Sequence, residues 1–306
     1  VSYSDKGFLT PQTDELDVSL DQFTEAARGA AQFDGEVVGL PTAAETVGLV
    51  YNKELVDSPP ETLSEMKAIM EEHHDPSNGS YGLSYPINPY FISGWAQAHG
   101  GYYFDHTKDP QLGLSLDETI KGLNIVLEDL QPFMPNDPKY GAQVAPFLDG
   151  NAPFAINGPW FLSATNDNNL DVGVSGLPTL SDGGPRPYTG ITLWYFSKGM
   201  GRDEGRANAA RAFAEWYATN EELLQSAAEE VGSIPVLKSL SGSDDLPPKV
   251  QGFSEAVEQG YPMPAHPKMN NVWGPMGDGF MKAFNGSADL RTAMEEAEST
   301  IRSNWE

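Results

Sequence analysis

The chain has 306 residues, 44 of them acidic and 18 basic, which gives a formal net charge of −26. This length allows one large domain or two of ordinary size, and 39% hydrophobic residues are enough to form real cores. The charge excludes nucleic acid as a partner, because phosphate binding needs clustered lysine and arginine. No stretch approaches the ~20 consecutive apolar residues of a membrane span. The absence of cysteine excludes thiolate metal sites, thiol nucleophiles and disulfides.

The acidity is interpreted as a property of the surface. Like charges repel one another and make a compact fold harder to hold in dilute buffer. At ~1 M salt the Debye length falls to about 3 Å, and most of that repulsion disappears. We therefore expect a solvated surface adapted to high salt rather than an acidic binding site, with adaptation to low pH as the alternative.

The first 35 residues are turn-rich and acidic, and no leader precedes Val1, so we expect a mature product or a fragment that begins inside a domain. Beyond them, short apolar runs alternate with amphipathic segments, which predicts an α/β fold. The predicted strands are Glu36–Leu40, Leu49–Tyr51, Gly82–Tyr85, Pro153–Ile156, Val172–Gly176 and Leu193–Phe196.

Helices are predicted with clearer boundaries. Thr62-Leu63-Ser64-Glu65 is a capping box that begins a helix toward His73. One helical face is shared by Ile120, Leu123, Leu127 and Leu130. Further helices are predicted over 207–217, 221–230, 248–259 and 290–301, the last with Ser287 as its cap. Trp216, inside one of them, is expected in the core.

Two polar stretches rich in Gly, Pro or Ser, Ser181–Pro187 and Ser239–Pro248, are predicted to be connectors. The piece between them is one strand followed by helices. This order indicates a chain that leaves one lobe, visits another and returns.

Sequence motifs for catalysis or metal binding are weak. His73-His74-Asp75 and Asp105-His106 lack the spacing of metal ligands, and the histidine pair is interpreted as a solvated helix end. There is no G-x-S-x-G elbow and no phosphate-binding glycine pattern. Many acid pairs exist, but none stands out as a glycosidase pair. The sequence therefore predicts no catalytic residue, metal site or cofactor.

Aromatic residues give a stronger signal. Pro89-Tyr90-Phe91, Gly158-Pro159-Trp160 and Asn271-Val272-Trp273-Gly274 each place a large ring beside Pro or Gly, near a predicted strand-to-helix turn. Such rings either plug the ends of a core or form a stacking platform for a flat, partly apolar ligand such as a sugar. A Trp covering ~100 Å² of sugar would contribute about 2–3 kcal/mol.

A series of motifs resembles the maltose/maltodextrin-binding proteins of ATP-binding-cassette importers over nearly the whole chain. The series begins with Asp34–Pro41, Glu45 and Leu49–Lys53. It continues with Pro89-Tyr90-Phe91, Gly100-Gly101-Tyr102, Ile156-Asn157-Gly158-Pro159-Trp160, Leu177-Pro178-Thr179 and Met263-Pro264 with Trp273.

The resemblance implies a two-lobed periplasmic-binding-protein fold of type II with a hinge, each lobe being α/β. The N-terminal lobe would comprise residues 1–43 and 194–242, and the C-terminal lobe residues 48–188 and 249–306. The hinge crossovers would lie near 44–47, 189–193 and 243–248. The family's first strands and helices are absent, so the first lobe is expected to be incomplete and to lack several dozen N-terminal residues. If this chain is all there is, it is expected to bind sugar weakly, through one lobe.

The resemblance also implies the binding residues. Tyr90, Trp160 and Trp273 match the family's stacking aromatics, with Phe91 beside Tyr90, and Glu45 matches a hinge carboxylate that accepts from sugar hydroxyls. Asn88 stands where a maltose binder commonly has Glu. Gly274 and Gly277 replace a Tyr and an Arg of the best-known members.

The expected function is binding of maltose or maltodextrins by a monomer and delivery to the membrane permease subunits of the importer. The protein would work in the periplasm or outside the cell, with a lipid anchor as one option. One alternative is a receptor for another di- or oligosaccharide, such as trehalose or a β-glucoside. Another is a carbohydrate-active hydrolase, which no motif favours, so no enzyme activity is predicted.

Overall fold

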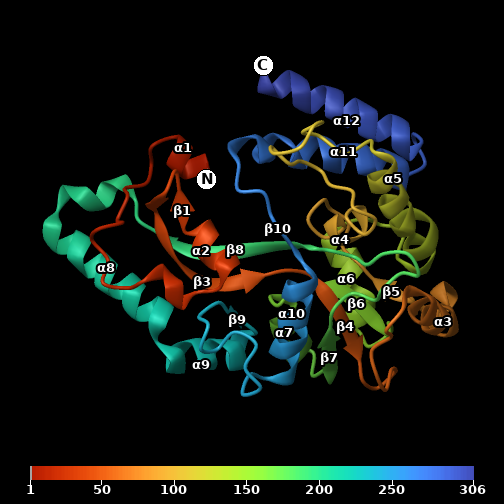
Figure 1. The fold of residues 1–306 in the computed structure, drawn as a ribbon. Coiled ribbons are helices and arrows are strands. Elements are labelled where there is room, and N and C mark those ends of the chain that lie inside the picture. The colour runs from red at the N-terminus through yellow and green to blue at the C-terminus, as the bar shows by residue number, and fades with distance from the viewer. Residues whose placement is uncertain (1) are drawn as a thin grey trace.

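The computed structural model describes residues 2–306, which form two four-stranded sheets with helices around them (Figure 1). The first sheet has the order β10-β8-β3-β9, and the second has the order β5-β6-β4-β7. The strands of the first are β3 (Gly39–Glu45), β8 (Tyr188–Tyr195), β9 (Ile234–Pro235) and β10 (Tyr261–Pro262). Those of the second are β4 (Gly48–Asn52), β5 (Leu83–Ser84), β6 (Phe154–Asn157) and β7 (Val172–Ser175). A two-stranded hairpin, β1 (Gln32–Phe33) and β2 (Glu36–Val37), precedes β3.

Two long strands cross the middle of the molecule. β3 and β8 pair antiparallel from Gly39↔Tyr195 to Glu45↔Gly190, with an irregularity between Pro41 and Ala43. β3 ends at Glu45 and β4 begins at Gly48, so the chain passes from one sheet to the other within two residues. Glu45 therefore lies at the junction of the two sheets.

The helices flank the sheets on both sides of this junction (Figure 1). On the side of the first sheet lie α1 (Ser2–Asp5), α2 (Glu25–Ala30), α8 (Glu204–Thr219) and α9 (Glu221–Val231). On the side of the second lie α3 (Leu63–His73), α4 (Ser93–Ala96), α5 (Asp117–Asn124), α6 (Tyr140–Leu148), α11 (Trp273–Phe284) and α12 (Leu290–Trp305). α7 (Phe161–Asp167) and α10 (Pro248–Gln259) lie near the middle. Short 3₁₀ turns cover Leu20–Gln22, Pro76–Asn78, Gln131–Phe133, Lys198–Arg202 and Pro267–Asn271.

The buried side chains form two large clusters. One gathers Trp95, Tyr103 and Phe280 under α4, α11 and α12. The other joins side chains of both sheets, such as Leu40 of β3 and Ala155 of β6. The second cluster therefore packs the two sheets against each other at the junction.

The structure confirms the predicted helices and five of the six predicted strands, with shifted ends. The predicted strand Glu36–Leu40 is divided between β2 and the start of β3. Both hydrogen bonds of the predicted capping box are present, since Glu65 N–H donates to Thr62 Oγ1 (3.2 Å) and Thr62 N–H to Glu65 Oε2 (3.2 Å). The cap of the last helix was predicted wrongly: α12 begins at Leu290, and Asp289 rather than Ser287 accepts from Thr292 N–H at 3.0 Å.

Two further expectations need correction. Residues Ile125–Leu130 form a π-helix that continues α5, and this changes which side chains point inward. Leu127 was expected on the buried face but is only half-buried, whereas Val126 is buried. Trp216 is 51% exposed rather than core, because α8 turns Ala207, Ala214 and Ala218 inward instead. Among residues 2–306, no helix combines the length and the apolar character that crossing a membrane requires.

Candidate functional site

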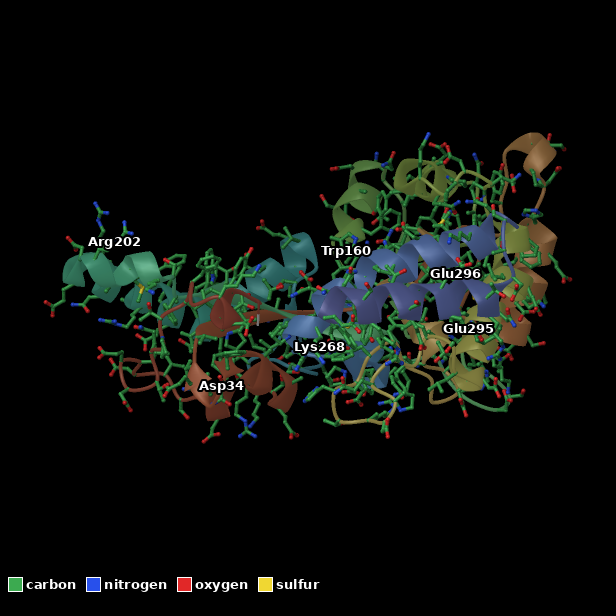
Figure 2. The ribbon with its side chains drawn as sticks, turned by 90° about the horizontal axis from the view of Figure 1, so that it is seen from above. Asp34, Trp160, Arg202, Lys268, Glu295 and Glu296 are labelled. Atoms are coloured by element: carbon green, nitrogen blue, oxygen red, sulfur yellow. The ribbon has the colours of Figure 1, made fainter. Side chains whose placement is uncertain are left out.

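Three of the predicted aromatic residues meet in one cluster. The Trp160 ring lies 6.3 Å from Tyr90 and 6.0 Å from Phe91, between ring centroids. Phe91 is buried and Tyr90 half-buried, whereas Trp160 is 41% exposed. Trp160 lies near the middle of the molecule, between the part that carries Arg202 and the part that carries Glu295 (Figure 2). The cluster thus presents one broad ring to solvent on a support of two others.

The backbone before Trp160 explains this position. A Cβ atom at Gly158 would lie only 2.2 Å from the Trp160 ring, so the indole can rest on the chain there only because residue 158 is glycine. Asn157, at the end of β6, accepts from Gly158 N–H through its side-chain oxygen at 2.9 Å. The turn and the ring above it are therefore held together.

Tyr140 extends the same cluster and was not predicted. Its ring lies 6.5 Å from Phe91, it is 46% exposed, and its hydroxyl accepts from Asn157 Nδ2 at 3.3 Å. The signal in the sequence was the one used for the other rings, since Tyr140 precedes Gly141 and follows Pro138 by two residues. The exposed aromatic surface therefore has two rings, Trp160 and Tyr140.

Glu45 supplies a charge beside this cluster. Its carboxylate is exposed, and Oε1 accepts a hydrogen bond of 3.0 Å from Thr192 Oγ1 on the neighbouring strand. Burial raises the pKa of the Tyr90 phenol, and the negative charge of Glu45 raises it further. The Tyr90 hydroxyl is buried and has no hydrogen-bond partner among residues 2–306. The Tyr90 phenol thus lies within electrostatic reach of the Glu45 carboxylate.

Asn88 adds a donor. Its side-chain oxygen accepts from the backbone N–H groups of Tyr90 (3.0 Å) and Phe91 (3.2 Å), which shapes the turn that carries both rings. The side chain is exposed, and its amide nitrogen is the part left for a ligand. Asn88 therefore presents N–H groups where a glutamate would present only acceptors.

Trp273 is placed on a different cavity. It begins α11, packs edge-on against Tyr188 at 5.8 Å between ring centroids, and lines a cavity of about 520 Å³ with Ile191 and Leu193 of β8. Because successive side chains of a strand point to opposite faces, this cavity lies on the face of β8 opposite to Thr192. The structure thus brings Tyr90, Phe91 and Trp160 together near Glu45 but does not put Trp273 in ring contact with them.

The two glycines that follow Trp273 differ in their surroundings. No atom lies within 4 Å of a Cβ placed at Gly274, so this position borders open space. A Cβ at Gly277 would meet the Pro89 ring at 3.3 Å. One turn after Trp273, α11 therefore packs against the turn that carries Tyr90.

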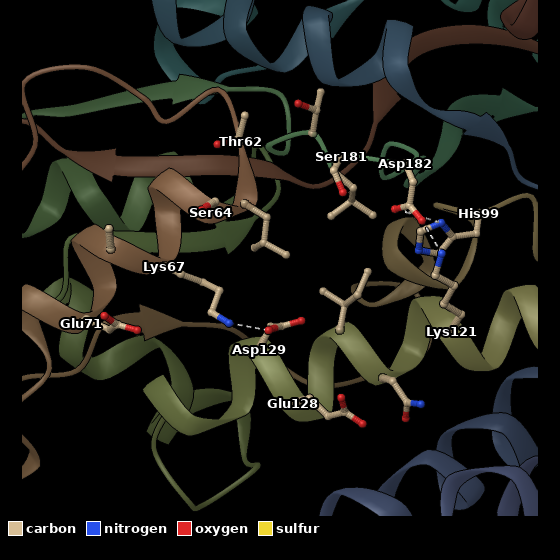
Figure 3. Close-up of a pocket in the computed structure, with 16 residues that line it drawn as sticks. Thr62, Ser64, Lys67, Glu71, His99, Lys121, Glu128, Asp129, Ser181 and Asp182 are labelled. Carbon is tan, nitrogen blue, oxygen red and sulfur yellow. Dashed lines mark hydrogen bonds and ion pairs between the residues drawn. The ribbon is translucent and has the colours of Figure 1, made fainter.

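A larger cavity than that of Trp273 lies elsewhere, between α3, the π-helix and residues 179–182 (Figure 3). It measures about 870 Å³ and contains none of the predicted binding residues. Its two lysines already have carboxylate partners, since Lys67 bonds Asp129 and Lys121 bonds Asp182. No aromatic ring other than that of His99 lines it, so it lacks a stacking surface for a sugar.

Two of the histidines weighed as metal ligands have structural contacts, and His106 stacks on His266 at 4.9 Å between ring centroids. His74 packs against Tyr81 and Phe133, and its Nδ1 accepts from Gly82 N–H at 3.3 Å. Within residues 2–306, no three His, Asp or Glu side chains gather in a way that could hold a metal ion. The arrangement described above is therefore one of stacking rings, one carboxylate and hydrogen-bonding groups.

Comparison with known proteins identifies relatives. Residues 1–252 match the bacterial extracellular solute-binding protein family. The chain is 41% identical over 279 residues to the maltotriose-binding protein of Pyrococcus abyssi (strain GE5 / Orsay), covering 89% of this chain and 60% of that protein. It is 25% identical over 285 residues to a maltooligosaccharide ABC transporter solute-binding lipoprotein of Streptococcus pneumoniae (strain ATCC BAA-255 / R6), covering 88% of this chain and 66% of that protein.

The fold has a solved counterpart. A crystal structure of a cyclo/maltodextrin-binding protein complexed with maltotetraose matches with a TM-score of 0.84 and 26% identity, covering 99% of this chain and 79% of that one. This match confirms the two-lobed periplasmic-binding-protein fold. The chain spans 60% of the length of its Pyrococcus relative. With its aromatic cluster beside a junction carboxylate, the chain belongs to the bacterial extracellular solute-binding protein family.

Proposed function

We propose that this chain binds maltose- or maltodextrin-type oligosaccharides between its two lobes and delivers them to an ABC importer. The observation that carries the proposal is the exposed Trp160 ring, supported by Tyr90 and Phe91 beside the Glu45 carboxylate. A pyranose has an apolar face for the ring and hydroxyl donors for the carboxylate. The relatives described as binding maltotriose and maltooligosaccharides support the same sugar class.

We further propose the roles of the individual groups. Trp160 and Tyr140 stack on the sugar, Glu45 accepts from its hydroxyls, and Asn88 donates to a sugar oxygen. Phe91 and Tyr90 hold the Trp160 ring in place. Trp273 and the Trp160 cluster belong to the same proposed lobe, so hinge closure does not bring them together. Trp273 instead contacts a part of the oligosaccharide that reaches the cavity it lines.

The lobe boundaries remain as predicted from the sequence: residues 1–43 with 194–242, and 48–188 with 249–306. Their support is the passage of β3 into β4 across residues 46–47. We also propose that the protein is a monomer outside the cell membrane, in contact with the permease subunits of an importer. The lipoprotein relative supports a lipid anchor.

Calorimetry in high salt with maltotriose, trehalose and a β-linked disaccharide tests the proposal. We expect heat of binding with maltotriose and a change in tryptophan fluorescence as Trp160 is covered. A preference for trehalose or the β-linked sugar would favour the other receptor function. Absence of a response to all three sugars would overturn the proposal, and product formed from labelled maltotriose would indicate a hydrolase.

A further inference from the structure

The contact between Thr192 and Glu45 assigns a second polar residue to the site. Thr192 lies in β8, its side chain is exposed, and its hydroxyl donates to Glu45 Oε1 at 3.0 Å. We propose that Thr192 binds the ligand directly and also positions the Glu45 carboxylate, so that the two residues together bind a pair of neighbouring hydroxyls. This inference rests on the proposed function and names two hydrogen-bond acceptors of the proposed sugar site.

The register of the two strands places both groups on one face. Glu45 is opposite Gly190, and Ala43 is opposite Thr192. Residues directly opposite each other point to the same side of a sheet, and so do residues two apart in one strand. Glu45, Gly190 and Thr192 therefore share a face of the β3–β8 pair. The side chains on the opposite face of β8, among them Ile191 and Leu193, line the cavity of Trp273, which the backbone of Gly190 also borders.

Gly190 leaves room above this pair. A Cβ atom at Gly190 would have only Glu45 atoms near it, the nearest at 4.0 Å. Apart from its chain neighbours, no other residue approaches that position within 4 Å. A ligand hydroxyl can therefore approach Thr192 and Glu45 from the side where a larger residue at 190 would stand.

The direction of the hydrogen bond determines what the pair can recognise. A threonine hydroxyl has one proton, and here Glu45 Oε1 accepts it. Thr192 Oγ1 is left with acceptor lone pairs only, and Glu45 Oε2 is a free acceptor as well. Two adjacent acceptors fit two adjacent donors, such as the hydroxyls on neighbouring carbons of a sugar ring.

The same bond strengthens the site. A hydroxyl that donates to a carboxylate becomes a better acceptor for a further donor, because hydrogen bonds in a chain polarise one another. Fixing Oε1 also restricts the rotation of the exposed Glu45 side chain. Less rotamer freedom then remains to be lost when the sugar binds.

The test uses Thr192→Val, Thr192→Ser and the matched control Thr42→Val. Thr42 lies in β3, and its hydroxyl donates to the Thr192 carbonyl at 3.1 Å without reaching Glu45. Hydrogen bonds that involve a charged group contribute enough for about a tenfold change in Kd. We expect Thr192→Val to raise the Kd for maltotriose about tenfold, whereas Thr192→Ser and Thr42→Val bind like the unchanged protein.

Two further readouts separate ligand contact from a structural effect. In a Glu45→Gln background the Thr192→Val change should have a smaller effect than alone, because the two groups act together. With a panel of monodeoxy maltosides, the unchanged protein should lose affinity for the analogues that lack the bound hydroxyls, and the Thr192→Val variant should not. Melting curves of all variants establish that they are folded.

The outcomes distinguish a wrong role for Thr192 from a wrong proposed function. If the unchanged protein binds maltotriose and Thr192→Val binds equally well, this inference is wrong and the proposed function stands. Additive effects of Glu45→Gln and Thr192→Val would also contradict it. If the unchanged protein binds no sugar, the proposed function fails, and the role of Thr192 fails with it.

Discussion

Replacing Trp160 by alanine should weaken sugar binding more than any other single truncation of an exposed ring. A Trp side chain has roughly 250 Å² of surface, and Trp160 is 41% exposed. The product is about 100 Å² available to a sugar ring. At about 25 cal/mol per Å² the covered area contributes about 2.5 kcal/mol, which corresponds to a roughly 70-fold increase in Kd.

The assay is calorimetry with maltotriose at high salt, together with tryptophan fluorescence during the titration. Trp216→Ala is the matched control, because Trp216 is 51% exposed on α8, outside the Trp160 cluster. We expect the control to keep the Kd of the unchanged protein and its fluorescence response. Trp160→Ala should lose both the affinity and most of the response.

The result that would refute the reasoning is a Trp160→Ala protein that is folded, as shown by its melting curve, and binds within about twofold of the unchanged protein. In that case the ring is not covered by sugar, and the exposed area has another use. A loss of affinity in Trp216→Ala of the same size would equally contradict the assignment, because it would place the ligand on α8.

Three further predictions concern the turn, a titrating group and the charge. Gly158→Ala should shift the fluorescence of Trp160 and weaken sugar binding at least tenfold in Kd, about 1.4 kcal/mol, because the new Cβ would lie 2.2 Å from the indole; unchanged spectra and Kd would contradict this. The pKa of His266 is lowered by burial and by the neighbouring His106 and Lys268. The native protein therefore binds this proton less readily than the unfolded chain, so the stability that depends on His266 should fall as the pH drops through its ordinary pKa of 6.5. An imidazole titration followed by NMR checks it, and a pKa above 6.5 would be inconsistent with the packing. Raising the salt from ~0.1 to ~1 M should raise the melting temperature, because screening reduces repulsion within a chain of charge −26; a lower melting temperature would show that the acidity has another role.

Much of the fold follows from local patterns in the sequence. The capping box at Thr62 and the apolar strand runs depend on neighbouring residues alone, so they could be read without knowledge of the tertiary structure. The π-helix after α5 could not be predicted in this way, because its i→i+5 hydrogen bonds depend on the packing of the whole helix rather than on its composition. Trp216 was wrongly predicted to be in the core for a similar reason, since the position of α8 on its sheet decides which face of the helix points inward.

The grouping of the candidate site's residues was predicted in part. Tyr90, Phe91 and Trp160 lie together because each stands in a turn at the end of a strand or before a helix, and such ends gather in space. Thr192 was missed because its meaning depends on strand register, which places it on the face of Glu45. Register also explains why Trp273 lies apart from the Trp160 cluster, since Ile191 and Leu193, which alternate with Thr192 along β8, line the cavity of Trp273.

The two-residue passage from β3 to β4 has a mechanical consequence. Glu45 stands where the chain leaves one sheet for the other, at one of the proposed hinge crossovers. A group near a pivot moves little, whereas a group far from it moves a long way. In the proposed binding mode, the Glu45 carboxylate therefore keeps nearly the same position as the lobes open and close, and it can bind a sugar hydroxyl before the lobes close around the ligand.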